Sequence, residues 1–124
     1  MADFLADSYA LVAFLEGNER YVGIFRRKSL VTTAMNVLEV YATLLRRIGR
    51  GEARELAAGL SSLAVPIPTE VALSAGEFRQ SMRSRKRDCS YIDAWGYASA
   101  QYLGVPFLTG DPAFRRIEHV EFVR

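Results

Sequence analysis

The chain has 124 residues, half of them apolar and 24% charged, a composition typical of a soluble globular protein of one domain. Its 16 Lys and Arg residues exceed its 14 Asp and Glu residues by only two, so net charge alone does not indicate nucleic-acid binding. The single cysteine excludes an intramolecular disulfide. No apolar run approaches the roughly 18 residues that span a bilayer, and the N-terminal residues lack the pattern of a signal peptide. We therefore expect a cytoplasmic protein with no membrane partner.

The first half of the chain predicts two strands and four helices. The strands are short apolar or β-branched runs at residues 4–7 and 30–33. The helices have apolar residues at spacings of three and four, and we expect them at residues 8–16, Glu19–Arg27, Ala34–Ile48 and 52–60.

The second half predicts two helices and three further strands. The helices are expected at residues 71–82, where the apolar stripe runs into a basic stretch, and at residues 90–103, which are rich in small side chains. The strands are expected at residues 64–67, 106–109 and 121–123, the first of them at a sheet edge because prolines flank it. Strands that alternate with helices predict an α/β fold with a mainly parallel sheet covered on both faces.

Four acidic residues fall at positions that such a sheet could bring together. Asp7 and Asp111 follow the strands at 4–7 and 106–109, at the carboxyl ends where open parallel sheets bind ligands. Asp93 and Glu39 lie near the starts of two of the helices. Carboxylate oxygens are the ligands that Mg²⁺ and Mn²⁺ prefer, and a metal held this way activates water for attack on a phosphodiester. Four converging carboxylates would also need a cation to offset their repulsion.

Each acid also has a purely structural alternative. Asp7 and Asp111 are placed to cap the helical turns that follow them, and Asp93 is placed to close a capping box with Ser90. Glu39 would then be an ordinary solvent-exposed helix residue. The spacing alone leaves both interpretations open.

Four short motifs occur in a fixed order along nearly the whole chain. They are Asp7-Ser8 after the first strand, Glu39 in the helix after Thr32-Thr33, Asp93-Ala94 at the start of a small-residue helix, and Leu108-Thr109-Gly110-Asp111-Pro112-Ala113-Phe114. In this order and spacing they resemble the PIN-domain family, and within it the VapC-type toxin ribonucleases. Tyr9 departs from the family pattern, in which a small hydroxyl or amide residue is common at that position.

The resemblance implies a single PIN-like domain over residues 1–124, with a three-layer α/β/α fold and a mainly parallel sheet of four to five strands. It implies an endoribonuclease that uses Mg²⁺ or Mn²⁺, forms a homodimer, and is held inactive by a VapB-type antitoxin. The hydroxyls of Ser8 and Thr109 would orient carboxylates or bound water. The residues that it assigns to the catalytic metal site are Asp7, Glu39, Asp93 and Asp111.

A basic cluster precedes the helix that carries Asp93, and it comprises Arg79, Arg83, Arg85, Lys86 and Arg87. Its position predicts that it holds an RNA backbone near the metal site. Cations are also favoured at the C-terminal ends of helices without any ligand. Cys89 lies beside this cluster, which would lower the pKa of its thiol, but no nucleophilic role is indicated.

Four aromatic residues are spaced along the 90–103 helix, namely Tyr91, Trp95, Tyr97 and Tyr102. Their spacing favours a place in the core or in a dimer interface over stacking on bases. The only histidine, His119, has no partner of its kind, and the four-acid scheme does not need it.

The sequence therefore favours a metal-dependent toxin endoribonuclease over three other hypotheses. The first two are a catalytically inactive PIN-like module that binds RNA or a protein, and a housekeeping PIN ribonuclease. The third is a phosphoacceptor signalling domain, which would need a lysine near the fourth or fifth strand, and the sequence has none there.

Overall fold

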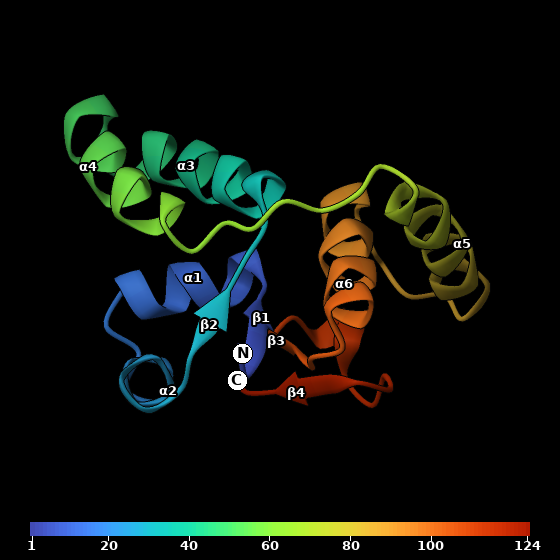
Figure 1. Cartoon of the computed structure of the whole chain (residues 1–124). Helices are drawn as coiled ribbons and strands as arrows, with labels where there is room; N and C mark the ends of the chain where they lie inside the picture. Colours follow the sequence, from blue (N-terminus) through green and yellow to red (C-terminus); the bar gives the residue numbers. More distant parts are fainter.

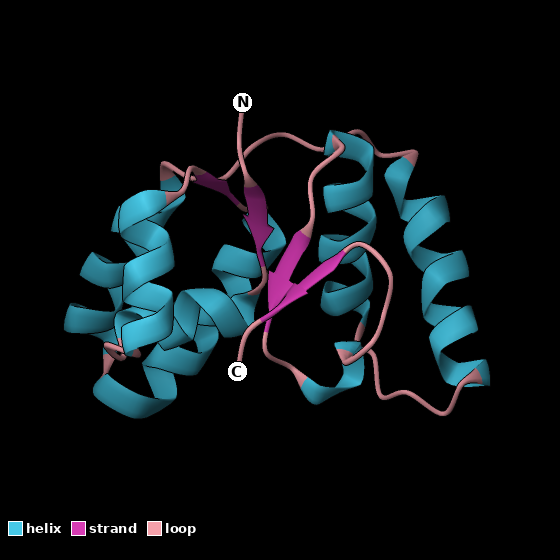
Figure 2. Ribbon diagram, turned by 90° about the horizontal axis from the view of Figure 1, so that it is seen from below, coloured by secondary structure: helices cyan, strands magenta, loops and turns pink.

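The computed structural model describes all 124 residues, which form three layers (Figure 1, Figure 2). A parallel sheet with the strand order β2-β1-β3-β4 forms the middle layer. Leu5 of β1 pairs with Val31 on one side and with Phe107 on the other, so β1 lies inside the sheet. The strands are β1 (Phe4–Ala6), β2 (Leu30–Val31), β3 (Phe107–Thr109) and β4 (Val120–Phe122).

Helices cover both faces of the sheet, as Figure 2 shows. One face is covered by α1 (Ser8–Leu15), α2 (Glu19–Arg27), α3 (Ala34–Ile48) and α4 (Arg50–Ser61). The other face is covered by α5 (Val71–Ser84) and α6 (Tyr91–Leu103), and the short 3₁₀ helix η1 (Pro112–Phe114) follows β3. The predicted three-layer α/β/α class is confirmed. None of these helices is both long and apolar enough to cross a membrane.

Each face of the sheet has its own hydrophobic core. Successive side chains of a strand point to opposite faces, so Leu5 and Phe107 pack under α5 and α6, whereas Ala6 and Leu108 pack under α1 to α4. In the first core the ring of Tyr97 stacks on Phe78, with the ring centroids 3.9 Å apart. The predicted core position of one aromatic residue of α6 is therefore correct, whereas Tyr91 and Tyr102 of the same helix are exposed.

Small residues allow α6 to lie close to the sheet. A Cβ atom added to Gly96 would lie 2.9 Å from the ring of Phe107, so a larger residue would push the helix away from β3. This contact accounts for the absence of a side chain at this point of α6, the helix that carries Asp93 in its first turn.

One predicted strand is wrong. Residues 64–67 form no strand, and only an isolated parallel bridge joins Ala64 to Thr32. Pro66 and Pro68 have no N–H group to donate to a neighbouring strand, so the pairing stops after one bridge. The sheet therefore has four strands. Smaller differences concern boundaries: α4 begins at Arg50 rather than at residue 52, and the last strand is Val120–Phe122.

Candidate functional site

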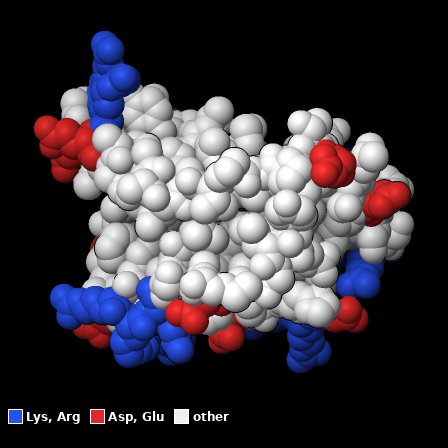
Figure 3. All heavy atoms as spheres, in the orientation of Figure 1, with Lys and Arg blue, Asp and Glu red and all other residues white.

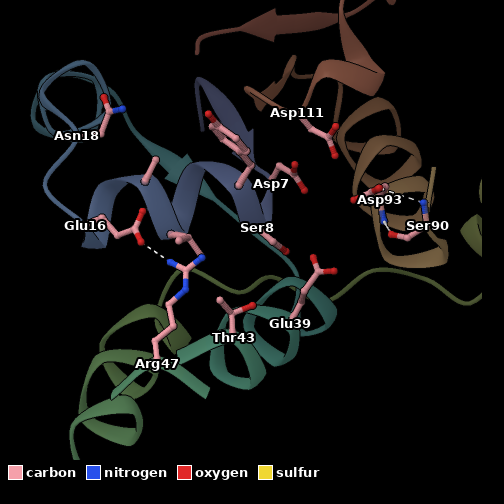
Figure 4. Close-up of a pocket in the computed structure, with 13 residues that line it drawn as sticks. Asp7, Ser8, Glu16, Asn18, Glu39, Thr43, Arg47, Ser90, Asp93 and Asp111 are labelled. Atoms are coloured by element: carbon pink, nitrogen blue, oxygen red, sulfur yellow. Dashed lines mark hydrogen bonds and ion pairs between the residues drawn. The ribbon is translucent and has the colours of Figure 1, made fainter. Parts of the chain in front are cut away.

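The carboxyl ends of β1, β2 and β3 open into one cleft of about 500 Å³. The strands are parallel, so these ends meet at the same edge of the sheet. Asp7, Glu39, Asp93 and Asp111 all line this cleft, and Figure 4 shows their side chains around one space. The structure thus brings together the four carboxylates that the sequence selected.

Asp7 is the most buried of these residues, with 2% of its surface exposed. Its Oδ2 atom accepts a hydrogen bond of 2.6 Å from the hydroxyl of Thr109, whereas its Oδ1 atom is buried without any partner. The side chain makes no capping bond to α1. The structural alternative for Asp7, a helix cap, is therefore wrong, and one buried carboxylate oxygen is left to be explained.

Burial and mutual repulsion shift the protonation of two of the acids. Burial, followed by the charges of Asp93 and Glu39, raises the pKa of Asp7 from 3.8 to about 7, although the hydrogen bond from Thr109 acts in the opposite direction. Burial and, to a smaller extent, the charges of Asp111 and Glu39 together raise the pKa of Asp93 to about 6, although its hydrogen bonds with Ser90 lower it. The four acids are thus close enough to act on one another electrostatically.

Asp93 and Asp111 do cap helical turns, as their structural alternatives predicted. Oδ2 of Asp93 accepts a bond of 3.0 Å from the backbone N–H of Ser90, and the Ser90 hydroxyl accepts one of 3.0 Å from the N–H of Asp93. Oδ1 of Asp111 accepts a bond of 2.9 Å from the N–H of Ala113. Each cap uses one carboxylate oxygen and fixes the side chain, so the second oxygen remains available to a ligand.

The four carboxylates do not form a closed coordination shell. No three His, Cys, Asp or Glu side chains are close enough together to hold one metal ion directly. The donors nevertheless fit a hard divalent cation, because they are all oxygens and Mg²⁺ is usually bound through one or two carboxylates while it keeps several waters. The buried and unpartnered Oδ1 of Asp7 is the donor that most needs such a charge beside it.

A polar network that the sequence did not reveal supports this cleft. Asn36 is fully buried; its Nδ2 donates to the Ser8 hydroxyl at 3.0 Å, and its Oδ1 accepts from the Thr33 hydroxyl at 2.6 Å. Ser8 is thus bonded to Asn36 rather than to a carboxylate. Asn36 lies one turn before Glu39 on α3, and a polar residue at that place in an otherwise apolar helix start was the available signal.

The basic cluster divides into bonded and free side chains. Arg79 donates to the Cys89 carbonyl at 2.9 Å and lies over the ring of Tyr91, and Arg87 donates to two backbone carbonyls at the end of η1. Arg83, Arg85 and Lys86 are exposed. Lys86 and Arg87 line a second hollow together with Asp93 and Asp111, so this end of the cluster adjoins the acidic cleft.

The thiol of Cys89 is not activated by its basic neighbours. The residue is buried, and burial raises the pKa of the thiol to about 12 despite the opposing charge of Arg79. The expectation of a lowered pKa is therefore wrong, because desolvation outweighs the nearby cation.

Comparison with known proteins identifies the family. The chain belongs to the PIN domain family, whose model matches residues 4–120. The motifs quoted from the sequence thus led to the correct family. A sequence search of curated proteins found no match.

Solved structures share the whole fold at low sequence identity. VapC20 of Mycobacterium tuberculosis, described as a toxin that cleaves the sarcin-ricin loop, is 22% identical, with a TM-score of 0.79 over 98% of both chains. A chain of a toxin–antitoxin complex from Klebsiella pneumoniae is 17% identical, with a TM-score of 0.75 over 94% of both chains. A chain of DNA-bound VapBC from Salmonella typhimurium is 15% identical, with a TM-score of 0.74 over 99% of this chain and 98% of that one.

Proposed function

We propose that this protein is an endoribonuclease that uses Mg²⁺ or Mn²⁺ and acts as the toxin of a VapBC-type toxin–antitoxin pair. The observation that carries the proposal is the buried Asp7 carboxylate, which keeps one oxygen unbonded in a cleft that three further acids line. A buried charge of this kind is costly unless a cation accompanies it.

In this proposal one or two of the carboxylates of Asp7, Glu39, Asp93 and Asp111 would contact the metal directly, and the others would hold it through its bound waters. When bound, the ion would supply Lewis acidity that activates water, and its positive charge would offset the negative charge of the phosphodiester. Thr109 donates to Oδ2 of Asp7, and Oδ1 of the same carboxylate is left without a protein partner. The backbone bonds to Asp93 and Asp111 keep these carboxylates in place before any ligand arrives. Asp7 has a pKa of about 7, so it must release its proton when the metal binds at lower pH.

The role as a toxin is supported by the structural relatives. One is described as a toxin that cleaves the sarcin-ricin loop, and others were solved as toxin–antitoxin complexes. We extend this to the present chain as a cytoplasmic toxin whose inhibitor is a VapB-type antitoxin.

The surface also suits protein partners. On the face in Figure 3 the charged side chains lie along the periphery, and the centre is uncharged. Leu38 is 54% exposed and Tyr91 is 75% exposed, and two grooves beside them are lined mostly by apolar side chains. Such uncovered apolar surface is typical of an interface, which supports both the homodimer and the antitoxin complex.

Activity is tested with the purified chain and single-stranded or structured RNA in Mg²⁺, in Mn²⁺ and in excess chelator. We expect endonucleolytic cleavage only with a metal, and none with Asp7→Asn or Asp93→Asn. The amide oxygen introduced by Asp93→Asn would still accept the bond from the backbone N–H of Ser90, so the fold of that variant should be retained. Glu55→Gln, at an exposed carboxylate of α4 that lines neither hollow, is the matched control and should cleave normally.

Three results would contradict parts of this proposal. Cleavage that persists in excess chelator would refute the metal mechanism, and RNA binding without cleavage in any metal would favour an inactive binding module. Toxicity is tested separately by induced expression. Growth that is unaffected by the wild-type chain, although the chain is active in vitro, would favour a housekeeping ribonuclease.

A further inference from the structure

The cleft continues along α3 beyond the four acids, and a single cation lies in that continuation. Glu39, Thr43 and Arg47 are four residues apart, so they share one face of α3, and all three line the cleft (Figure 4). Arg47 is the only Lys or Arg among the 13 lining residues, which include five carboxylates. Eight residues of helix separate Arg47 from Glu39, about 12 Å along the axis.

Arg47 is held by a contact that solvent weakens. Its guanidinium donates to Oε2 of Glu16, at the end of α1, and this is the only ion pair in the protein. The two side chains are 52% and 56% exposed, and ion pairs at such exposure contribute little to stability. A guanidinium has five N–H donors in a planar fork, and only one nitrogen is used here. The ion pair can therefore exchange, and Arg47 can bind a second anion beside Glu16 or another anion in place of Glu16.

The position of Arg47 matches a repeating polyanion better than a single metal-bound phosphate. A phosphate at Arg47 would lie about 12 Å from the helix turn that carries Glu39. A strand that crosses the cleft would thus place one phosphate at the acids and another, further along the same strand, at the guanidinium. Arginine is well suited to this contact because its fork matches two phosphate oxygens.

We propose that Arg47 is a positioning residue that binds a backbone phosphate of the RNA strand a few nucleotides from the bond that is cut. Glu16 orients the guanidinium in the free protein and is displaced when the strand enters. This inference rests on the proposed nuclease function, and it assigns one end of the path that the substrate takes through the cleft.

Arg46 provides a matched control. It lies in the same last turn of α3, where both arginines complement the helix dipole. Its guanidinium donates to the Ala42 carbonyl of its own helix, and it does not line the cleft. If only the positive charge at this helix end matters, substitution of either arginine should therefore weaken RNA binding. If Arg47 contacts a phosphate, only its substitution should do so.

The test compares Arg47→Ala with Arg46→Ala in two assays, after circular dichroism has shown that both variants are folded. In metal-dependent cleavage, Arg47→Ala should raise KM about tenfold with little change in kcat, the loss expected for a charge-assisted hydrogen bond made equally in the ground and transition states. The second assay is fluorescence anisotropy with a labelled single-stranded RNA, with both variants made in the Asp93→Asn background. There, Arg47→Ala should reduce the slope of log Kd against the logarithm of the salt concentration by about 0.7, the value for one lost phosphate contact. Arg46→Ala should change neither quantity.

Glu16→Gln supplies a test of opposite sign. It removes the competing carboxylate, so RNA affinity should increase while Arg47 stays in place. Three results would overturn the inference: equal effects of the two arginine variants, weaker RNA binding by Glu16→Gln, or faster cleavage by Arg47→Ala. Absence of cleavage by the wild type would refute the nuclease proposal alone, because the anisotropy assay still decides whether Arg47 contacts the strand.

Discussion

Replacing Asp7 by Asn should stabilise the metal-free protein at pH 8, although the same change should abolish activity. The folded protein holds the Asp7 carboxyl in a buried site where its pKa is about 7, against 3.8 for an exposed aspartate. A carboxyl whose pKa is raised by folding contributes its full stability below pH 3.8, and this contribution is lost as the pH rises through 7. At pH 8 the ionised carboxylate therefore opposes folding.

The size of the effect follows from the two pKa values. An increase from 3.8 to about 7 corresponds to an upper limit of roughly 4 kcal/mol of lost stability at pH 8. The amide oxygen of asparagine would still accept the hydrogen bond from Thr109. Its amide nitrogen would take the place of Oδ1, where it has no partner, and this buried unsatisfied donor would lower the free energy of unfolding by about 1–2 kcal/mol. We expect the metal-free variant to be about 2–3 kcal/mol more stable than the wild type at pH 8, with the difference shrinking toward pH 4.

Urea unfolding in EDTA at a series of pH values measures this difference directly. Asp88→Asn, at an exposed carboxylate, is the control and should follow the wild type throughout. Added Mg²⁺ should stabilise the wild type and not Asp7→Asn, because only the wild type keeps the buried charge. A variant that is less stable than the wild type at pH 8 in EDTA, or a difference that does not depend on pH, would refute the electrostatic argument.

Three further substitutions test the surroundings of the site. Thr109→Val removes the hydrogen bond to Asp7, so the pKa of that carboxyl should rise further and Mg²⁺ affinity at pH 7 should fall about tenfold in calorimetric titration. Gly110→Ala would place a Cβ 2.3 Å from the Val123 carbonyl oxygen and should lower the free energy of unfolding by about 2–4 kcal/mol, whereas Gly59→Ala, with open space around it, should not destabilise. Asn36→Leu leaves two buried hydroxyls without their amide partner and should cost about 1–3 kcal/mol in chemical unfolding.

The sequence predicted the elements of this fold well because their signals are local. Apolar spacing located every α-helix, and the short apolar runs located the strands of the sheet. The wrong strand at residues 64–67 has the same kind of local pattern, but a strand also needs a partner with which it can exchange hydrogen bonds. Prolines prevent this beyond the single bridge to Thr32, and periodicity does not report it.

The site was less accessible to prediction because it depends on strand order. The order β2-β1-β3 makes neighbours of the strands that precede Glu39, Asp7 and Asp111, and the sequence pattern does not specify that order. Local signals also suggested that a cap and a ligand role exclude each other, whereas Asp93 caps α6 with one oxygen and keeps the other free. The burial of Asn36 and the contact of Arg47 with Glu16 arise from packing between distant elements and left no signal strong enough to select them.

The charges of the cleft also imply an order of binding. Five carboxylates line it, and its only cation is paired with Glu16 rather than with any of the four acids. Without a metal the acids near Asp7 would repel a phosphodiester, and burial makes that repulsion stronger than in water. In anisotropy measurements completed before cleavage, the wild-type chain should therefore bind RNA more tightly in Mg²⁺ than in EDTA, and the gain should disappear in Asp7→Asn. An affinity that is equal with and without Mg²⁺ would mean that the strand does not approach the acids at all, and the assigned path along α3 would have to end before Glu39.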